Sequence, residues 1–248
     1  MILTNRTNLK NLRTQLDHDR EQRSKDRSLS MRREIYLAAA EAIASAMNTV
    51  ARYGDLSLSQ NELTAEYRAK SDQISKIHVV ASEETALRFI AFMRDLGATF
   101  IKLNIQRMEL SSARAHMQTL IQRINSHNAS RDHYLELMKK FNVDGTMDEQ
   151  RMAVLESGFK FEQESATKVA LEHDALLEEL RPKHLAFVET CQSENMRLSR
   201  SLLPLIESVR AELENPINVD LYSKVFEGAP VATRKDLEAL FGVKSSET

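Results

Sequence analysis

The sequence predicts an all-α protein: an elongated antiparallel bundle of long, coiled-coil-like helices, followed by two short C-terminal helices. Three observations support this prediction. The 248 residues include only six Gly and four Pro, so few turns interrupt the chain. Apolar residues recur at helical spacing over long stretches. No segment between turn signals alternates apolar and polar residues for long enough to indicate a strand.

Capping residues mark where the helices begin. Ser59 with Glu62, and Thr146 with Glu149, match the capping box, in which two side chains satisfy free backbone N–H groups of the first turn. Ser82, followed by two glutamates, is a further N-cap. The predicted helices cover residues 4–53, 59–78, 82–141, 146–214, 219–227 and 234–241, with a turn at 142–145.

Alternating steps of three and four residues predict where the two longest helices meet. From Met93 to Met138, ten of fourteen such positions are apolar, and from Met152 to Leu180 on the return helix, seven of nine are. This pattern indicates a coiled-coil seam interrupted by polar residues. From Leu110 onward, the first seam comprises Leu110, Arg114, Met117, Ile121, Ile124, Asn128, Arg131, Leu135 and Met138.

The return helix is expected to be irregular. Its apolar pattern slips between Pro182 and Cys191 and resumes at Leu198, as in a stutter that locally unwinds a supercoil. Pro182 and Pro204 are expected to bend or break it. At about 1.5 Å per residue, a helix over 82–141 would reach roughly 90 Å. A compact chain of this size has a radius of gyration of only about 18 Å, so we expect an arm.

Three regions follow from these patterns. Residues 1–30 form a polar, basic N-terminal helix or stalk that is continuous with the bundle. Residues 31–214 form the long-helix bundle, in which the alanine-rich segment 36–47 is expected to lie close against two neighbouring helices. Residues 215–248 form the short C-terminal helices and a tail.

The search for chemistry finds no catalytic, cofactor-binding or metal-binding set. Glycines are too widely spaced for a phosphate-binding loop, and no Glu-x-x-His pair of a di-iron bundle occurs. His133 with Glu136 is at most half of a metal site, and a solvated helix face explains it better. Cys191 fits a small apolar seam residue better than a nucleophile. An enzyme would need polar seam residues, Glu162 with His173 or Arg107 with Arg114, to converge in one pocket.

Charge is distributed unevenly along the chain. Overall, 34 Lys and Arg face 36 Asp and Glu, so the whole chain does not attract nucleic acid. The first 33 residues carry a net charge of +5 and the remainder −7. The candidate partner or anionic surface therefore comprises Arg6, Lys10, Arg13, Arg20, Arg23, Lys25, Arg27, Arg32 and Arg33.

Residues 17–28 contain no apolar side chain, which has two interpretations. A solvated helix can cross a gap between two anchored ends, held by i,i+4 ion pairs such as Glu21–Lys25 and Asp19–Arg23. Alternatively, the strip binds an anionic membrane surface or nucleic acid. Nucleic acid is less favoured, because acidic residues are interspersed and no aromatic side chain is present to stack on bases.

The segments NRTNLKNLRTQL (residues 5–16) and MRREIYLAAAE (residues 31–41) resemble a type of uncharacterised bacterial helical protein. In those proteins a similar polar helix emerges directly from one or more N-terminal membrane helices, whereas this chain begins at Met1-Ile-Leu without one. The resemblance implies no activity and no catalytic residue. It implies that the basic flank faces the cytoplasm and that the polar strip lifts the bundle off the bilayer.

We therefore expect a non-enzymatic structural or interaction module with no cofactor, which self-associates or binds a protein partner through its long helices. The lone Cys191 favours a reducing compartment. The N-terminus lacks the apolar stretch of a secretory signal. The expected location is the cytoplasm, peripheral to or tethered at the inner membrane. The alternative is a module that binds nucleic acid or another anionic ligand through its N-terminal arginines.

Overall fold

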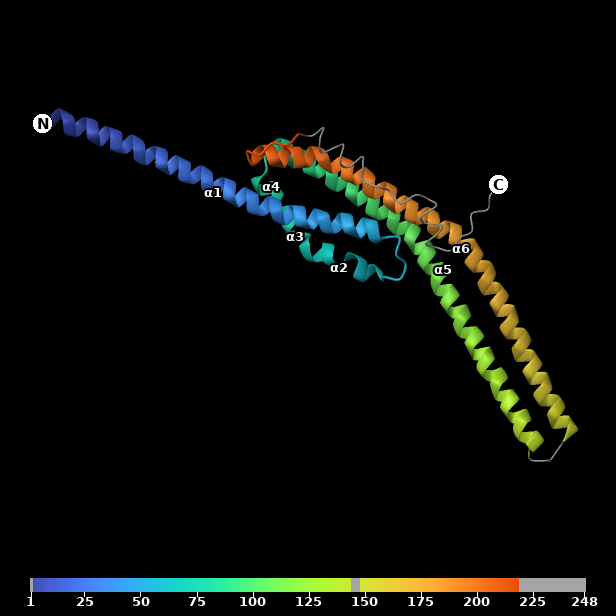
Figure 1. Ribbon diagram of the computed structural model, residues 1–248. Coiled ribbons are helices and arrows are strands. Elements are labelled where there is room, and N and C mark those ends of the chain that lie inside the picture. Colours follow the sequence, from blue (N-terminus) through green and yellow to red (C-terminus); the bar gives the residue numbers. More distant parts are fainter. Residues whose placement is uncertain (1, 144–147, 219–248) are drawn as a thin grey trace, which may run out of the picture. The chain divides into compact units, whose positions relative to one another are not determined.

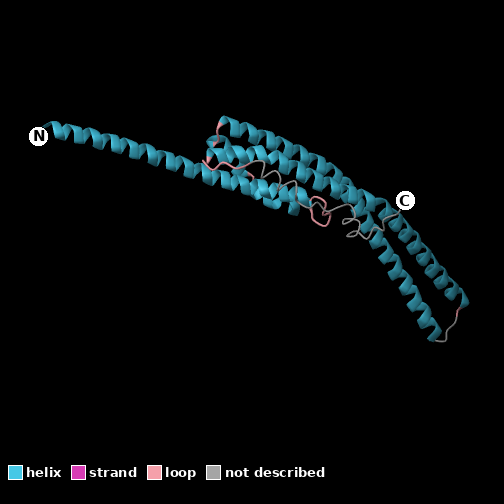
Figure 2. Ribbon diagram, turned by 45° about the horizontal axis from the view of Figure 1, so that its top comes forward, coloured by secondary structure: helices cyan, strands magenta, loops and turns pink. Residues whose placement is uncertain are grey.

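The computed structural model describes residues 2–143 and 148–218, and within these ranges it contains helices and loops but no strand (Figure 2). The predicted all-α class is confirmed. The helices are α1 (Ile2–Arg52), α2 (Gln60–Lys70), α3 (Asp72–Ser75), α4 (Ile77–Val80), α5 (Glu83–Val143) and α6 (Glu149–Glu212).

The caps predicted at Ser59 and Ser82 are confirmed, whereas α6 begins at Glu149, later than predicted, and the backbone nitrogen of Gln150 donates to Asp148 Oδ1 at 3.1 Å. At α2, the backbone nitrogen of Glu62 donates to Ser59 Oγ at 3.2 Å, and that of Ser59 donates to Glu62 Oε2 at 2.7 Å. At α5, the backbone nitrogen of Thr85 donates to Ser82 Oγ at 3.3 Å. The predicted cap at Thr146, the turn at 144–145 and the helices over 219–227 and 234–241 lie outside the described residues.

The prediction of a single helix over residues 59–78 is wrong, because this segment forms three short helices. Backbone hydrogen bonds to the third preceding residue end α2 and α3. The backbone nitrogen of Ser71 donates to the carbonyl of Arg68, and that of Lys76 donates to the carbonyl of Gln73. Such bonds tighten a helix end and let the chain change direction. The three pieces thereby keep contact with α1 along the segment.

Backbone contacts divide the described chain into two units, each treated separately below. The first unit comprises residues 2–103 and 191–218, and so contains α1 to α4, the start of α5 and the end of α6. The second unit comprises residues 104–143 and 148–190, where the remaining parts of α5 and α6 run antiparallel (Figure 1).

The core of the first unit depends on the alanine-rich part of α1. Ala39, Ala42 and Ala46 are at most 1 % exposed, so small side chains let neighbouring helices approach α1 closely, as predicted. Large side chains from every other helix complete this core, and Cys191 of α6 is buried there as a small apolar residue. The larger members are Tyr53, Leu63, Ile74, Ile77, Phe89, Phe92, Leu96, Leu103, Leu198 and Leu205.

The seam of the second unit is confirmed at every predicted position on α6 and at six of nine on α5, where Arg114, Ile121 and Leu135 are exposed. All nine α6 positions predicted from Met152 to Leu180 are buried or half-buried. On α5 the true stripe takes a step of three where we expected four, so Leu120 is fully buried while Ile121 is 44 % exposed. His127 and Tyr134 likewise face α6, whereas Leu135 is exposed.

The predicted interruption of α6 by proline does not break the helix, which continues from Glu149 to Glu212. Each proline removes one backbone donor and crowds the preceding turn, which destabilises a helix by about 3 kcal/mol. Packing offsets this cost locally. Leu185 and Phe187 are buried just after Pro182, and Leu203 and Leu205 are buried on either side of Pro204.

Candidate interaction surfaces

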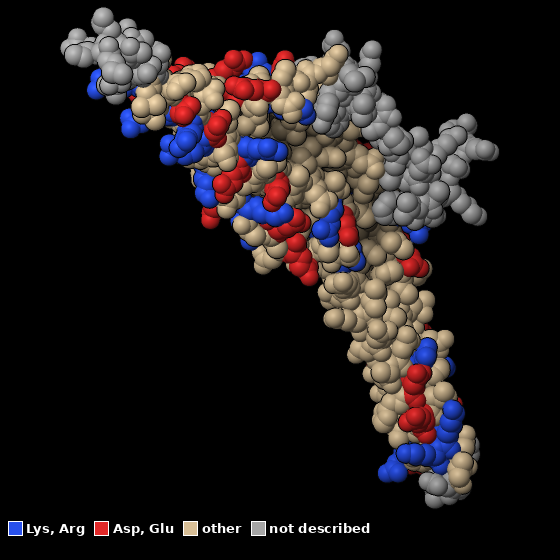
Figure 3. Space-filling view, turned by 60° about the vertical axis from the view of Figure 1, so that its left-hand side comes forward, with Lys and Arg blue, Asp and Glu red and all other residues tan. Residues whose placement is uncertain are grey.

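The polar strip of α1 is solvated, as its composition predicts. Every side chain over residues 12–28 is exposed, including Leu12 and Leu16 on one face. Of the predicted ion pairs, Glu21–Lys25 forms at 3.3 Å. This stretch carries five basic and four acidic residues, so its own net charge is only +1. On the face that Figure 3 shows, Lys and Arg are interspersed with Asp and Glu.

The predicted anionic-surface residues do not share one environment. Arg13, Arg20, Arg23, Lys25, Arg27 and Arg33 are exposed, while Arg6 and Lys10 lie on α1 with side chains outside the described set. Arg32 is different. Its guanidinium lies 3.7 Å from a carboxylate oxygen of Glu212, so it belongs to the first unit rather than to a free basic surface.

Glu212, in the last turn of α6, ties three helices together. One carboxylate oxygen accepts the backbone N–H of Ser82 at 3.0 Å and the Ser82 hydroxyl at 2.5 Å. The other accepts the Tyr36 hydroxyl of α1 at 2.5 Å. Next to them, the hydroxyls of Thr85 and Ser208 are hydrogen-bonded in the core. We call Tyr36, Ser82, Thr85, Ser208 and Glu212 the capping cluster.

The capping cluster favours a charged Glu212. Burial would raise the pKa of this carboxyl, but hydrogen bonds from Ser82, Thr85 and Tyr36 together outweigh it and lower the pKa. Burial and the neighbouring Glu212 raise the pKa of Tyr36, so its hydroxyl stays protonated and donates. Because the Glu212 carboxylate lies at the start of α5, its charge also interacts favourably with the positive end of the α5 dipole.

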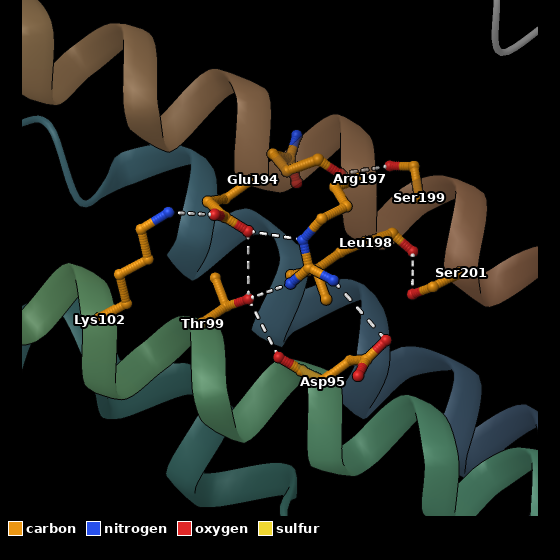
Figure 4. A network of polar contacts seen from close by, with 9 residues as sticks. Asp95, Thr99, Lys102, Glu194, Arg197, Leu198, Ser199 and Ser201 are labelled. Carbon is orange, nitrogen blue, oxygen red and sulfur yellow. Dashed lines mark hydrogen bonds and ion pairs between the residues drawn. The ribbon is translucent and has the colours of Figure 1, made fainter.

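A second polar network joins α5 and α6 in the first unit (Figure 4). Glu194 accepts from Lys102 Nζ at 2.6 Å and from Arg197 Nε at 2.8 Å. Arg197 also donates to the Thr99 hydroxyl at 2.7 Å and lies 3.6 Å from Asp95. We call these five residues the arginine network.

Glu194 is the centre of the arginine network. It is 9 % exposed, whereas Lys102 and Arg197 remain about half exposed. The hydrogen bond from Lys102, aided by Arg197, lowers the pKa of Glu194 against the opposing effect of burial. The buried carboxylate is thus charged and paired, which is the condition under which burying a charge is tolerated. This arrangement links α5 to α6 within the first unit.

Polar seam residues of the second unit pair individually and do not form one site. His127 Nδ1 lies 2.7 Å from Glu162 Oε2 across the seam. His173 contacts its neighbour Asp174 at 3.1 Å. The convergence of Glu162 with His173 that an enzyme would need is therefore not seen. Arg107 is buried and Arg114 is exposed, so these two do not meet in a pocket either.

A cavity of about 370 Å³ lies between α5 and α6 in the second unit, where the α6 pattern slips. Leu110, Leu180 and Phe187 line it, and the Glu179 carboxylate at its edge pairs with Lys183. Its lining includes neither His nor Cys. The predicted half-site of His133 and Glu136 is exposed, away from this cavity.

Apolar side chains also lie on the outer faces of the helices. In the second unit they occur on both α5 and α6, facing solvent. These residues are Ile105, Met108, Ile121, Leu135, Val143, Val154, Phe161 and Leu171. In the first unit, Leu37, Leu87, Ile90 and Ile101 are exposed in the same way. Single exposed apolar residues are ordinary, whereas contiguous apolar patches are typical of interaction sites.

In the part of the chain that the structure describes, no three His, Cys, Asp or Glu side chains are grouped to hold a metal ion. Within residues 2–143 and 148–218, none of the helices combines the length and apolar character that crossing a bilayer requires. Comparisons with protein-family models, curated proteins and solved structures find no match to this chain. Functional inference therefore depends on the geometry.

Sequence reasoning did not single out Glu212 or Glu194, although both organise the first unit. Their partners lie on other helices, 130 residues away for Ser82 and 92 for Lys102. Periodicity along one helix shows which face is buried but not which distant residue lies opposite. The only local signal is a glutamate at the inner face of a helix, beside buried apolar residues such as Cys191 and Leu198.

Proposed function

We propose that this chain is a non-enzymatic interaction module whose long helices associate with a second copy of the chain or with helices of a protein partner. The observation that carries the proposal is how the helices of the second unit are packed. In its described residues only α5 and α6 contribute, each buries one face against the other, and apolar side chains remain on the outer faces. Further helices would cover those faces.

The polar clusters support a structural role for the buried carboxylates. Glu194 and Glu212 are each engaged by several donors of their own unit. Their hydrogen bonds favour the charged form, as helix-to-helix ties require, rather than a group poised to exchange a proton near neutral pH. This assigns them to holding helices in place.

Sedimentation velocity of the full chain over a wide concentration range tests the self-association. We expect the weight-average sedimentation coefficient to rise with concentration toward that of a dimer or larger oligomer. A coefficient that stays at the monomer value throughout would exclude self-association. The search would then move to a heterologous helical partner.

We place the module at the inner face of a bacterial membrane, on the basis of the basic N-terminal flank. Co-sedimentation with vesicles containing anionic lipid tests this location. We expect the full chain to bind and the variant Arg20→Gln/Arg23→Gln/Arg27→Gln to bind less, with salt releasing both. Neutralising three exposed basic residues elsewhere is the matched control: Arg123, Lys139 and Lys140. Equal loss from both variants would count against a specific role for the strip.

The alternative is nucleic-acid or anionic-ligand binding through the same arginines. One observation favours it: the side chains of Arg13, Arg20, Arg23, Arg27 and Arg33 are exposed. The interspersed acids and the pairing of Arg32 with Glu212 weaken it. A fluorescent DNA or RNA probe titrated at low salt should bind with an affinity that falls steeply as salt rises, if this alternative holds. No retention at low salt would eliminate it.

A further inference from the structure

The outer face of α6 in the second unit carries a row of side chains at heptad spacing. Ser157, Phe161, Glu164, Lys168 and Leu171 follow one another at steps of four, three, four and three, and Ala175 continues the row. We call these six residues the outer row. They alternate with the inner seam residues of α6, which face α5, so the outer row points away from α5.

The outer row is uncovered in the described structure. Phe161 is 63 % exposed and Leu171 is 66 % exposed. Glu164 and Lys168 are also exposed, and no ion pair or hydrogen bond of either side chain occurs among the described residues. Some other pairs of Glu and Lys four apart do form ion pairs, as Glu179 and Lys183 do at 2.6 Å, while Glu136 with Lys140 and Glu156 with Lys160 form none among the described residues. The charges of Glu164 and Lys168 therefore remain available to an external partner.

From Ser157 to Ala175 the order of residues along the row is complementary to itself when reversed, whereas Val154, which precedes Ser157 on the same face, would meet Glu178. A second α6 placed antiparallel, with a two-fold axis at the level of Ala166, brings Phe161 opposite Leu171 of the other copy. The same operation brings Glu164 opposite Lys168, and Ser157 opposite Ala175. Each of these layers occurs twice because the arrangement is symmetric. In each layer, one heptad position of the row faces the other heptad position of the second copy, which is the geometry of an antiparallel coiled coil.

From this complementarity we infer that the outer row of α6 is a self-association surface, occupied by the antiparallel α6 of a second copy of this chain. The inference depends on the proposed function and specifies which surface performs it. Two apolar layers flank a central pair of Glu–Lys layers. The apolar layers supply the burial, while the charged layers fix the antiparallel orientation and the register.

Charge reversal tests the inference. In a Glu164→Lys homodimer, the introduced lysine would face Lys168 in both central layers, and in a Lys168→Glu homodimer two glutamates would face each other. We expect each variant alone to raise the dimer dissociation constant by about tenfold or more. An equimolar mixture of the two variants should recover the wild-type affinity, since in the heterodimer a lysine faces a glutamate in both central layers. The double variant Glu164→Lys/Lys168→Glu should also recover it, because opposite charges again meet in both layers.

Glu156→Lys is the matched control, because it makes the same charge change on an exposed position of α6 outside the outer row. It should associate as the wild type does. Circular dichroism of every variant confirms that the helices remain folded.

Four outcomes of sedimentation velocity are distinguishable. Loss of association in the single variants with recovery in the double variant supports the inference. Loss without recovery overturns the antiparallel register. A wild-type oligomer that neither reversal weakens overturns the outer row but leaves the proposed function intact. A wild-type chain that is monomeric at every concentration overturns both.

Discussion

The Glu212 carboxylate lies 3.0 Å from the backbone nitrogen of Ser82, so the last turn of α6 caps the first turn of α5. The two residues are 130 positions apart in the sequence. The same carboxylate accepts the Tyr36 hydroxyl and lies beside the Arg32 guanidinium. The Glu212 side chain thereby links α1, α5 and α6 at the point in the first unit where they meet.

Replacing Glu212 by Ala should lower the free energy of unfolding by about 1–3 kcal/mol, because the donors of Ser82 and Tyr36 lose their acceptor in a partly buried site. Chemical denaturation followed by circular dichroism measures the effect. Glu41→Ala, an exposed glutamate on α1, is the control and should change little. Equal effects of both substitutions would contradict a capping role for Glu212.

Stability should depend on pH through the same residue. Hydrogen bonds hold the pKa of Glu212 below its ordinary value in the folded chain. Its contribution is therefore fully present above the unfolded pKa of about 4.3, and it is lost as the pH falls through the lower folded pKa. Glu212→Gln should thus destabilise the chain at neutral pH but make little difference in strong acid. A difference that stays constant with pH would contradict this assignment.

The arginine network should contribute more per ion pair than the exposed pairs do. A double-mutant cycle with Glu194→Gln and Lys102→Met should give a coupling energy of about 1 kcal/mol, because Glu194 is nearly buried. Glu179 and Lys183 offer a matched pair at the same 2.6 Å separation but with both side chains exposed. Their cycle should give a clearly smaller coupling energy, because solvent screens an exposed pair. Similar coupling in the two cycles would refute the effect of burial.

Two helical glycines should respond oppositely to alanine. A Cβ at Gly97 of α5 would meet nothing within 4 Å, so Gly97→Ala should stabilise the chain by about 0.5–1 kcal/mol through helix propensity. A Cβ at Gly158 of α6 would lie 2.6 Å from Tyr134 Cζ. Gly158→Ala should therefore destabilise it by about 1–3 kcal/mol through overpacking.

Removing the Tyr134 ring tests the reason for that difference. In a Tyr134→Ala background, Gly158→Ala should become neutral or stabilising, because the side chain that it would strike is gone. Thermal melts of the four combinations measure the effect. If Gly158→Ala still destabilises the chain without the ring, overpacking against Tyr134 is not the cause.

The pair formed by His127 and Glu162 should tolerate replacement of both residues by apolar ones, but not the loss of Glu162 alone. Glu162→Ala leaves the half-buried His127 without its partner and should destabilise the second unit. The double replacement His127→Leu/Glu162→Leu should be at least as stable as the wild type, since well-packed apolar residues often match a desolvated polar pair. Chemical denaturation of the variants measures both effects. The pair His116 and Glu172, which is about half exposed, is the control, and the same double change there should bring no gain.

The sequence was sufficient for the caps at Ser59 and Ser82 and for the inner face of α6, because local patterns determine both, but not for the starts of α3, α4 and α6. On α5 it failed by one residue, and the reason is visible in the composition. Leu120 and Tyr134 are each followed by another apolar residue, so steps of three and four fit the sequence in either order. Only the facing helix decides between Leu120 and Ile121. The same limitation hid the capping cluster and the arginine network, whose members are distant in sequence.

Cys191 gives the first unit a built-in probe of its own fluctuations. Its side chain is 1 % exposed in the core between α6 and its neighbours, so a thiol reagent reaches the sulfur only when those helices separate. The chain has no other cysteine, and every alkylation event therefore reports the same opening. The labelling rate of the unmodified protein thus measures how often this core opens, without any engineered label.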